Sequence, residues 1–203
     1  MNHDLNSVKK ARGYHHGDLR AAVIAAAEEV IGERGLDRFS LRETARRAGV
    51  SPAAPAYHFG DARGLLTALA ADAFRRFGDA LAAADRDGDR TARIRAQGMA
   101  YVGFALAHPA KFDLMWRYAL IDREDADYGA AAARAFAVID KAVRGEEAIA
   151  RQGDIAVAPS IACWSMVHGF ARLALDGAFG TNEGAAERAA EALLPAVLRH
   201  LDV

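Results

Sequence analysis

Residues 39–61 read FSLRETARRAGVSPAAPAYHFGD, and this segment contains the most informative helix start and stop signals of the chain. Ser40 begins a capping box, because its hydroxyl can accept the third amide of a helix while Glu43 reaches back to the first. Gly49 ends that helix after about two turns, since glycine takes the left-handed conformation that other residues resist. Ser51-Pro52 then opens another short helix, with a cap followed by proline at the first helical position. The stretch therefore predicts two short helices joined by a sharp glycine turn.

Another helix precedes this pair. Asp18 can cap its start, and Gly35 stands where a left-handed helix stop is expected. Between them, one apolar stripe recurs at spacings of three and four residues: Leu19, Val23, Ala27, Val30 and Ile31. The resulting helix-turn-helix arrangement occurs in DNA-binding proteins, and it also occurs as a purely structural corner. We expect residues 1–64 to form this head.

The remainder of the chain, residues 65–203, predicts a larger helical body. A long helix over residues 65–84 connects the two parts, so the boundary between head and body lies inside a continuous helix near Leu65. The further predicted segments are a helix over 91–107, an aromatic segment over 112–118, a helix over 125–143, a charged loop over 145–153 and two final helices with long apolar stripes. The expected fold class is therefore all-α.

Composition and charge agree with a globular, helix-prone chain. It has 203 residues, of which 52% are hydrophobic, and a formal net charge of −1. No stretch reaches the roughly 20 apolar residues that a membrane helix needs, and the polar N-terminus lacks the apolar core of a secretory signal. The single cysteine, Cys163, cannot form an internal disulfide and lies in an apolar stretch, where burial is expected. We therefore expect a cytoplasmic protein with no membrane association.

A basic arm precedes the first helix. It contains Lys9, Lys10, Arg12, His15, His16 and Arg20. Such an arm can neutralise phosphates and release counterions, whereas a solvated tail without a partner has a similar composition. Lys10 and Arg12 are candidates for contact with the phosphate backbone or the adjacent minor groove.

Taken together, the motifs from Gly13 to Leu66 resemble the TetR (tetracycline-repressor-like) family of bacterial regulators. The resemblance rests on the order and spacing of Glu33-Arg34-Gly35, Phe39 to Ala45, Gly49-Val50-Ser51, His58-Phe59 and Leu65-Leu66. In the body, Trp164 to Gly169 (WSMVHG) is similar to the Trp-His-Gly signature of one branch with a particular C-terminal domain. The resemblance implies a homodimer that binds a near-palindromic operator and releases DNA when a small molecule enters the body.

The chain departs from the family pattern in and after its third helix. Ala56 stands where a tyrosine is usual and the tyrosine has moved to Tyr57, while Ala62 replaces a usual lysine, with Arg63 beside it. Pro55 removes one amide donor and presses against the carbonyl four residues earlier, which predicts a shortened helix or a 3₁₀ start. These departures affect individual DNA contacts more than the fold.

If the head docks as in the family, both short helices contact DNA. The predicted contact residues are Lys10, Arg12, Ser40, Arg42, Ser51, Pro52, Ala53, Tyr57, His58 and Arg63. Small apolar side chains contact thymine methyl groups but cannot read hydrogen-bonding base edges, so sequence reading falls to Arg42, Tyr57 and DNA shape. Tyr57 and His58 are also expected to touch phosphates. The alternatives are a core role for Tyr57 and a turn-closing hydrogen bond for His58.

The resemblance also implies an effector pocket and a dimer interface in the body. The predicted pocket residues are Phe104, Phe112, Trp116, Trp164 and His168, which suit a largely apolar small molecule. In the alternative, these aromatic side chains are core, and His168 satisfies a buried partner. The predicted dimer contacts, from the last two helices, are Val167, Ala171, Leu175, Leu194, Val197, Leu198 and Leu201. Their alternative role is to close the core of a single subunit.

No catalytic, metal or cofactor site is predicted. The sequence has no glycine-rich phosphate loop, nucleophile elbow or closely spaced His/Cys/Asp set. We expect a non-enzymatic regulator of transcription, acting as a ligand-responsive repressor that binds a double-stranded DNA operator as a homodimer. The alternatives are an activator, and a ligand-binding or partner-binding helical dimer whose head no longer recognises DNA.

Overall fold

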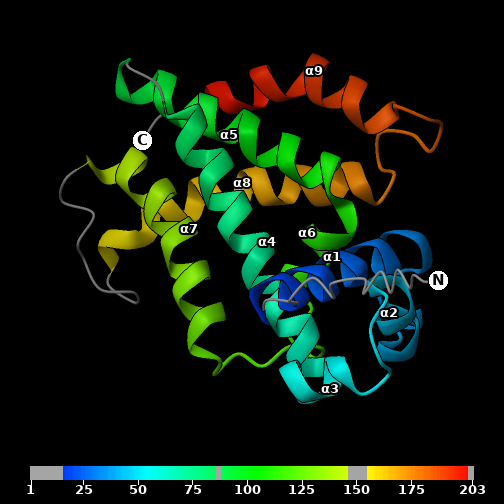
Figure 1. Cartoon of the computed structure of the whole chain (residues 1–203). Helices are drawn as coiled ribbons and strands as arrows, with labels where there is room; N and C mark the ends of the chain where they lie inside the picture. Colours follow the sequence, from blue (N-terminus) through cyan, green and yellow to red (C-terminus); the bar gives the residue numbers. More distant parts are fainter. Residues whose placement is uncertain (1–15, 86–87, 146–154, 201–203) are drawn as a thin grey trace, which may run out of the picture.

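A computed structural model describes residues 16–85, 88–145 and 155–200 of the chain. The residues in these ranges form helices and loops with no strand, which confirms the predicted all-α class (Figure 1). In chain order the α-helices are α1 (His16–Arg34), α2 (Leu41–Ala48), α3 (Ala54–Phe59), α4 (Ala62–Ala84), α5 (Arg90–Ala107), α6 (Pro109–Trp116), α7 (Ala126–Arg144), α8 (Ala158–Leu175) and α9 (Ala185–Val197). Short 3₁₀ turns are η1 (Leu36–Arg38), η3 (Ile155–Val157) and η4 (Leu198–His200).

The first three helices form the head as the local signals predict. Gly35 follows α1 with φ 75°, and Gly49 ends α2 in the left-handed conformation with φ 67°. The Ser40 hydroxyl accepts the Glu43 amide at 3.4 Å, which caps the start of α2. These residues act locally, so each helix end is encoded by the amino acids at that end.

Helix α3 begins later than predicted. The expected start was Ser51-Pro52, but these residues form a turn in which the Ala54 amide donates to the Ser51 carbonyl at 3.0 Å. Pro55 lies in the first turn of α3, where its missing N–H leaves no bond unmade. A helix that started at Pro52 would need the Pro55 amide to bond to the Ser51 carbonyl, which proline cannot do. The result is the shortened helix that Pro55 predicts, only six residues long.

Helix α4 joins the head to the body. Asp61 caps it by accepting the Gly64 amide at 2.8 Å, and the helix begins at Ala62, three residues before the predicted start at residue 65. The helix packs against α1 and α3 in the head and against α5, α6 and α7 in the body. Gly78 allows α7 to approach closely, because a Cβ there would lie 3.3 Å from the Ala135 Cα. The predicted division near Leu65 therefore falls within one continuous helix.

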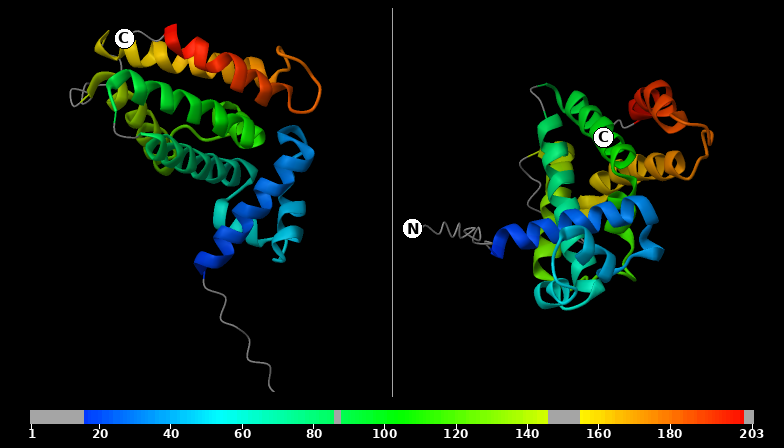
Figure 2. Two further views of the ribbon diagram at one scale, coloured as in Figure 1. Left: turned by 90° about the horizontal axis from the view of Figure 1, so that it is seen from above. Right: turned by 45° about the vertical axis from the view of Figure 1, so that its right-hand side comes forward.

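Helices α8 and α9 complete the body on the side away from α3 (Figure 2). Helix α8 packs on α5 and α7, and α9 packs on α8 and α5. Gly98 on α5 makes room for the end of α9, since a Cβ at this position would lie 2.6 Å from the Leu198 Cδ2. The core of the body is therefore built from α4 to α8 and closed by the last helix.

Candidate nucleic-acid interface and ligand cavity

Six exposed residues on α2, α3 and the turn between them define what we call the head surface: Arg42, Ser51, Pro52, Ala53, Ala56 and Tyr57. The side chain of Tyr57 is 82% exposed and meets the His58 ring edge-on, with ring centroids 5.1 Å apart. This exposure excludes the alternative that Tyr57 is a core aromatic. Around Tyr57 and Arg42 the surface is made of small side chains. It therefore offers few groups that can hydrogen-bond to base edges.

An ion-pair network holds α2 against α1. Glu43 accepts hydrogen bonds from Arg46 at 2.8 Å, from Arg47 at 3.0 Å and from Arg34 of α1 at 3.1 Å. Arg47 also pairs with Glu33 of α1. Hydrogen bonds from Arg46 and Arg47 lower the pKa of Glu43 to about 2. The carboxylate predicted to reach back to the start of α2 instead serves as the centre of this network.

Two other predicted contact residues have partners within the protein. The Arg63 guanidinium donates to the Ile121 carbonyl at 2.9 Å, which ties the start of α4 to the loop after α6. This bond uses one of the five N–H donors of the guanidinium, so the others can still contact a phosphate. Ser40 is half-buried, and its hydroxyl caps α2. Lys10 and Arg12 lie outside the described residues.

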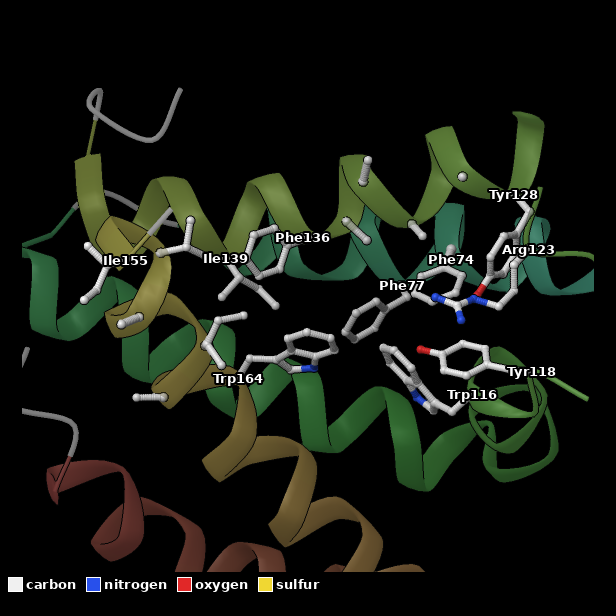
Figure 3. Close-up of a pocket in the computed structure, with 18 residues that line it drawn as sticks. Phe74, Phe77, Trp116, Tyr118, Arg123, Tyr128, Phe136, Ile139, Ile155 and Trp164 are labelled. Atoms are coloured by element: carbon white, nitrogen blue, oxygen red, sulfur yellow. The ribbon is translucent and has the colours of Figure 1, made fainter. Parts of the chain in front are cut away.

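A cavity of about 960 Å³ lies in the body between α4, α7, α8 and the segment that follows α6 (Figure 3). Its walls are aromatic and aliphatic: Phe74, Phe77, Trp116, Tyr118, Tyr128, Ala132, Ala135, Phe136, Ile139, Ile155, Ile161 and Trp164 are among them. The volume falls within the range of small-molecule sites in proteins, and an apolar lining of this kind is typical of such sites. Arg123 contributes a cation at one end of the cavity.

Of the five predicted pocket residues, Trp116 and Trp164 line this cavity and the other three do not. Phe112 is fully buried in the core, and Phe104 packs against Phe77 with ring centroids 5.2 Å apart. His168 does not line the cavity; it is linked through the Tyr101 hydroxyl to the lining residue Trp164. These three side chains belong to the packing that supports the cavity, and a direct contact with an effector stays a prediction for them.

A hydrogen-bonded chain of three side chains fixes one wall of the cavity. The Trp164 indole N–H donates to the Tyr101 hydroxyl at 3.0 Å, and that hydroxyl lies 2.8 Å from the His168 Nδ1. Because the hydroxyl accepts from Trp164, its own proton is free to be donated to His168. Burial, and then the charge of Arg172, lower the pKa of His168, which favours the neutral ring that accepts this bond. His168 thus satisfies a buried partner, the alternative raised from the sequence.

The segment from Trp116 to Asp125 borders the cavity and also bonds to the head. Arg117 pairs with Asp37 of η1 at 3.1 Å. The Ile121 carbonyl accepts from Arg63, and the Asp122 amide donates to the Thr67 hydroxyl at 2.8 Å. We call this segment, residues 116–125, the bridge segment. The wall residues Trp116 and Tyr118 are therefore within a few residues of Arg117 and Ile121, which contact the head.

The predicted dimer residues divide into two groups. Val167, Ala171, Leu194 and Leu198 are buried within this chain's own core, and therefore offer almost no surface to a partner. Leu175 and Val197 are half-buried, and Leu201 lies outside the described residues. The exposed apolar residues of this face include Leu173, 52% exposed, and Leu193, 45% exposed; they border a groove together with Met166, Phe179 and Val197. These exposed residues, rather than the four buried ones, are available to a partner on α8 and α9.

Two classes of site are not found in the described part of the chain. The residues in these ranges contain no group of three or more His, Cys, Asp or Glu side chains that could hold a metal ion. No described helix is long and apolar enough to cross a membrane.

Comparison with protein families assigns both parts of the chain. Residues 23–69 match the family described as "Bacterial regulatory proteins, tetR family", and residues 94–197 match "Tetracyclin repressor-like, C-terminal domain". The chain belongs to the TetR family. It is therefore a DNA-binding transcriptional regulator with a helix-turn-helix head and a helical C-terminal domain. The branch suggested by the Trp-His-Gly motif stays a prediction.

Several solved structures share the fold over most of the chain. A Rhodococcus sp. RHA1 protein described as of unknown function is 33% identical, with a TM-score of 0.74 over 95% of this chain and 100% of that one. The regulatory protein SCO4313 is 25% identical, with a TM-score of 0.71 over 95% of this chain and 98% of that one. The TetR family regulator PfmR from Thermus thermophilus is 22% identical, with a TM-score of 0.62 over 87% of this chain and 97% of that one. A comparison with curated proteins finds no match.

Sequence reasoning missed most of the cavity wall of this TetR-family protein. One detectable signal was present on α7, where Tyr128, Ala132, Phe136 and Ile139 follow helical spacing and all line the cavity. A stripe of this kind looks the same whether it faces a core or a cavity. Only the packing of α7 against α4 and α8 decides which it is.

Proposed function

We propose that this protein is a ligand-responsive repressor that acts in the cytoplasm. It binds a near-palindromic operator as a homodimer and releases DNA when a small, largely apolar molecule occupies the cavity. The observation that carries the proposal is the bridge segment, because it contributes Trp116, Tyr118 and Arg123 to the cavity wall and also bonds to Asp37, Arg63 and Thr67. A ligand that alters this wall changes the contacts that hold the head.

On DNA, the head surface is expected to enter the major groove in each half-site. Arg42 can bond to a base edge, and Tyr57 can contact a phosphate or a thymine methyl group. The small side chains of Ala53 and Ala56 let α3 approach the bases closely without reading their hydrogen-bonding pattern. Much of the specificity is then expected to come from DNA shape, and much of the affinity from phosphates.

The proposed homodimer pairs the exposed apolar face of α8 and α9 across a two-fold axis. Leu173 and Leu193 are exposed on this face, and Val197 and Phe179 are half-buried beside them. Apolar residues grouped on one face of a helix pair are stabilised when a partner removes them from water. The buried set of Val167, Ala171, Leu194 and Leu198 supports this face from within.

The proposal is tested by selecting operator fragments from genomic DNA with the purified protein and measuring their affinity by fluorescence anisotropy over a range of salt concentrations. We expect affinity to fall steeply with salt and the half-sites to lie about one helical turn or more apart. Arg42→Glu should abolish specific binding. Arg90→Glu is the matched control, because Arg90 is an exposed arginine at the start of α5 in the body.

Light scattering on both variants separates loss of DNA contact from loss of the dimer. If no fragment is enriched even at low salt while the dimer is intact, the protein is instead a helical dimer with a degenerate head. If reporter expression falls when the gene is deleted, the protein is an activator, and the repressor proposal is wrong.

A further inference from the structure

The cavity has two chemically different ends. Tyr118, Arg123 and Tyr128 lie at one end, and Ile139 and Ile155 lie at the other, with Trp116, Trp164 and Phe77 between them (Figure 3). Among the lining residues that the structure describes, Arg123 alone carries a formal charge. The distance along α7 from Tyr128 to Ile139 is eleven residues, or about 16 Å. The cavity therefore suits an elongated ligand that differs between its ends.

Arg123 is oriented toward the cavity by an aromatic ring. Its guanidinium carbon lies 4.5 Å from the centroid of the Tyr118 ring, which is a cation–π contact. The cation is also close enough to Tyr128 to oppose the upward shift that burial causes in the pKa of that phenol. Figure 3 shows the guanidinium between the two tyrosine rings.

Three of the four neighbouring carboxylates have other partners. Asp125 caps α7 by accepting the Tyr128 amide at 2.8 Å, Asp127 pairs with Arg75 at 2.8 Å, and Asp122 accepts the Glu124 amide at 3.2 Å. Within the described ranges, no carboxylate lies at ion-pair distance from Arg123. The bridge segment is thus rich in acidic groups, yet the charge that borders the cavity is positive.

We infer that the effector is an amphipathic carboxylate, with its anionic group on Arg123 and an aromatic or other rigid apolar body along the cavity. This inference rests on the proposed ligand-responsive function and adds the chemical class of the ligand. Arginine presents a planar set of donors that matches a carboxylate in two parallel bonds. The seven aromatic rings of the wall favour a body with rings, which they contact edge-on or in offset stacks. A neutral apolar molecule would leave the Arg123 end unused.

Two matched probes test the inference: 1-pyrenebutyrate, which carries the carboxylate, and 1-pyrenebutanol, which does not. Both tryptophans of the chain, Trp116 and Trp164, line the cavity, so energy transfer from tryptophan to pyrene reports binding without DNA. We expect the carboxylate to bind about tenfold more tightly than the alcohol. Arg123→Gln should remove this preference, because it weakens binding of the carboxylate far more than binding of the alcohol.

Arg134→Gln is the matched control, because Arg134 is an exposed arginine on the adjacent helix α7 and does not line the cavity. This variant should keep the preference for the carboxylate. Equal affinity of the wild-type protein for the two probes, a preference that survives Arg123→Gln, or no binding of either probe would each overturn the inference. None of these results bears on operator binding, which is measured separately, so a failure here is distinct from a failure of the proposed function.

Discussion

Ion pairs hold charged side chains of the head in place, and Glu43, which pairs with three arginines, is the clearest example. Its carboxylate accepts from Arg34, Arg46 and Arg47, and through Arg34 it joins α2 to α1. The hydrogen bonds that lower its pKa to about 2 also make its contribution to stability depend on pH. A group with a lowered pKa stabilises the fold above its unfolded pKa, and that stabilisation is lost as the pH falls toward the folded pKa.

Glu43→Gln is therefore expected to lower the melting temperature at pH 7, because a neutral amide cannot pair with the guanidinium groups. The difference between wild type and variant should stay constant down to about pH 4.5 and then shrink toward about pH 2, where the wild-type carboxylate is itself protonated. Thermal unfolding followed by circular dichroism checks this. Glu183→Gln, at an exposed glutamate outside the network, should have no such effect. A difference that persists unchanged at low pH would show that packing, rather than charge, is lost.

Tyr101 offers a second test at this scale. Tyr101→Phe removes the hydroxyl that joins Trp164 to His168, leaving two polar groups without this partner in a buried site. We expect the free energy of unfolding to fall by about 1–3 kcal/mol. Tyr128→Phe should cost less, because its hydroxyl donates to the Met115 carbonyl at a longer distance of 3.4 Å. Urea denaturation of both variants checks the order, and equal losses would contradict it.

Among the elements, the turn between α2 and α3 depends on backbone conformation alone. Gly49 has φ 67°, and a Cβ built there meets no atom within 4 Å. Gly49→Ala should therefore destabilise the protein by about 1–2 kcal/mol through left-handed strain, with no contribution from a clash. Gly103→Ala, inside α5 and equally open, is expected to stabilise it by up to about 1 kcal/mol. Opposite signs in urea denaturation would support this account, and a loss at both positions would refute it.

The elements also show what could be predicted from sequence. The ends of α2, α4 and α7 follow from Ser40, Gly49, Asp61 and Asp125, because a cap acts within one turn of the residue that forms it. The start of α3 was misplaced because Ser51-Pro52 gives a good local start signal, whereas Pro55 three residues later favours another. Capping residues therefore predict the end of a helix well where no second start or stop signal lies within the same few residues.

At the scale of the whole molecule, the sequence predicts the role of apolar residues less well. An apolar stripe has the same pattern whether it faces the core, a cavity or a partner. Phe112 and Trp116 lie four residues apart on one helix, yet Phe112 is fully buried and only Trp116 lines the cavity. Likewise, Leu194 on α9 faces its own core while its neighbour Leu193 is exposed. These differences arise from how the helices of the body pack together, and periodicity within one helix does not contain that information.

The bridge segment should couple the cavity to the head, and Thr67 provides a test of this coupling. Thr67 is buried on α4, accepts the Asp122 amide at 2.8 Å and donates to the Arg63 carbonyl at 2.7 Å. Thr67→Val keeps the shape of the side chain but removes the bond to the bridge segment. We expect the variant to bind operator and 1-pyrenebutyrate separately, while the effect of each on the other is reduced.

Coupling between two sites is reciprocal, so the factor by which the probe weakens operator binding must equal the factor by which operator weakens probe binding. In the wild-type protein, we expect this factor to lie between about 5 and 150. In Thr67→Val it should be smaller but stay above 1, because the bonds of the bridge segment to Arg63 and Asp37 remain. Anisotropy measures the first factor, and energy transfer from tryptophan measures the second. Thr44→Val is the control, because Thr44 is also buried but bonds only within the head, to the Ser40 carbonyl. Equal coupling in both variants would mean that the signal travels by another route, through α4 itself or through the contact of Lys111 with Glu28.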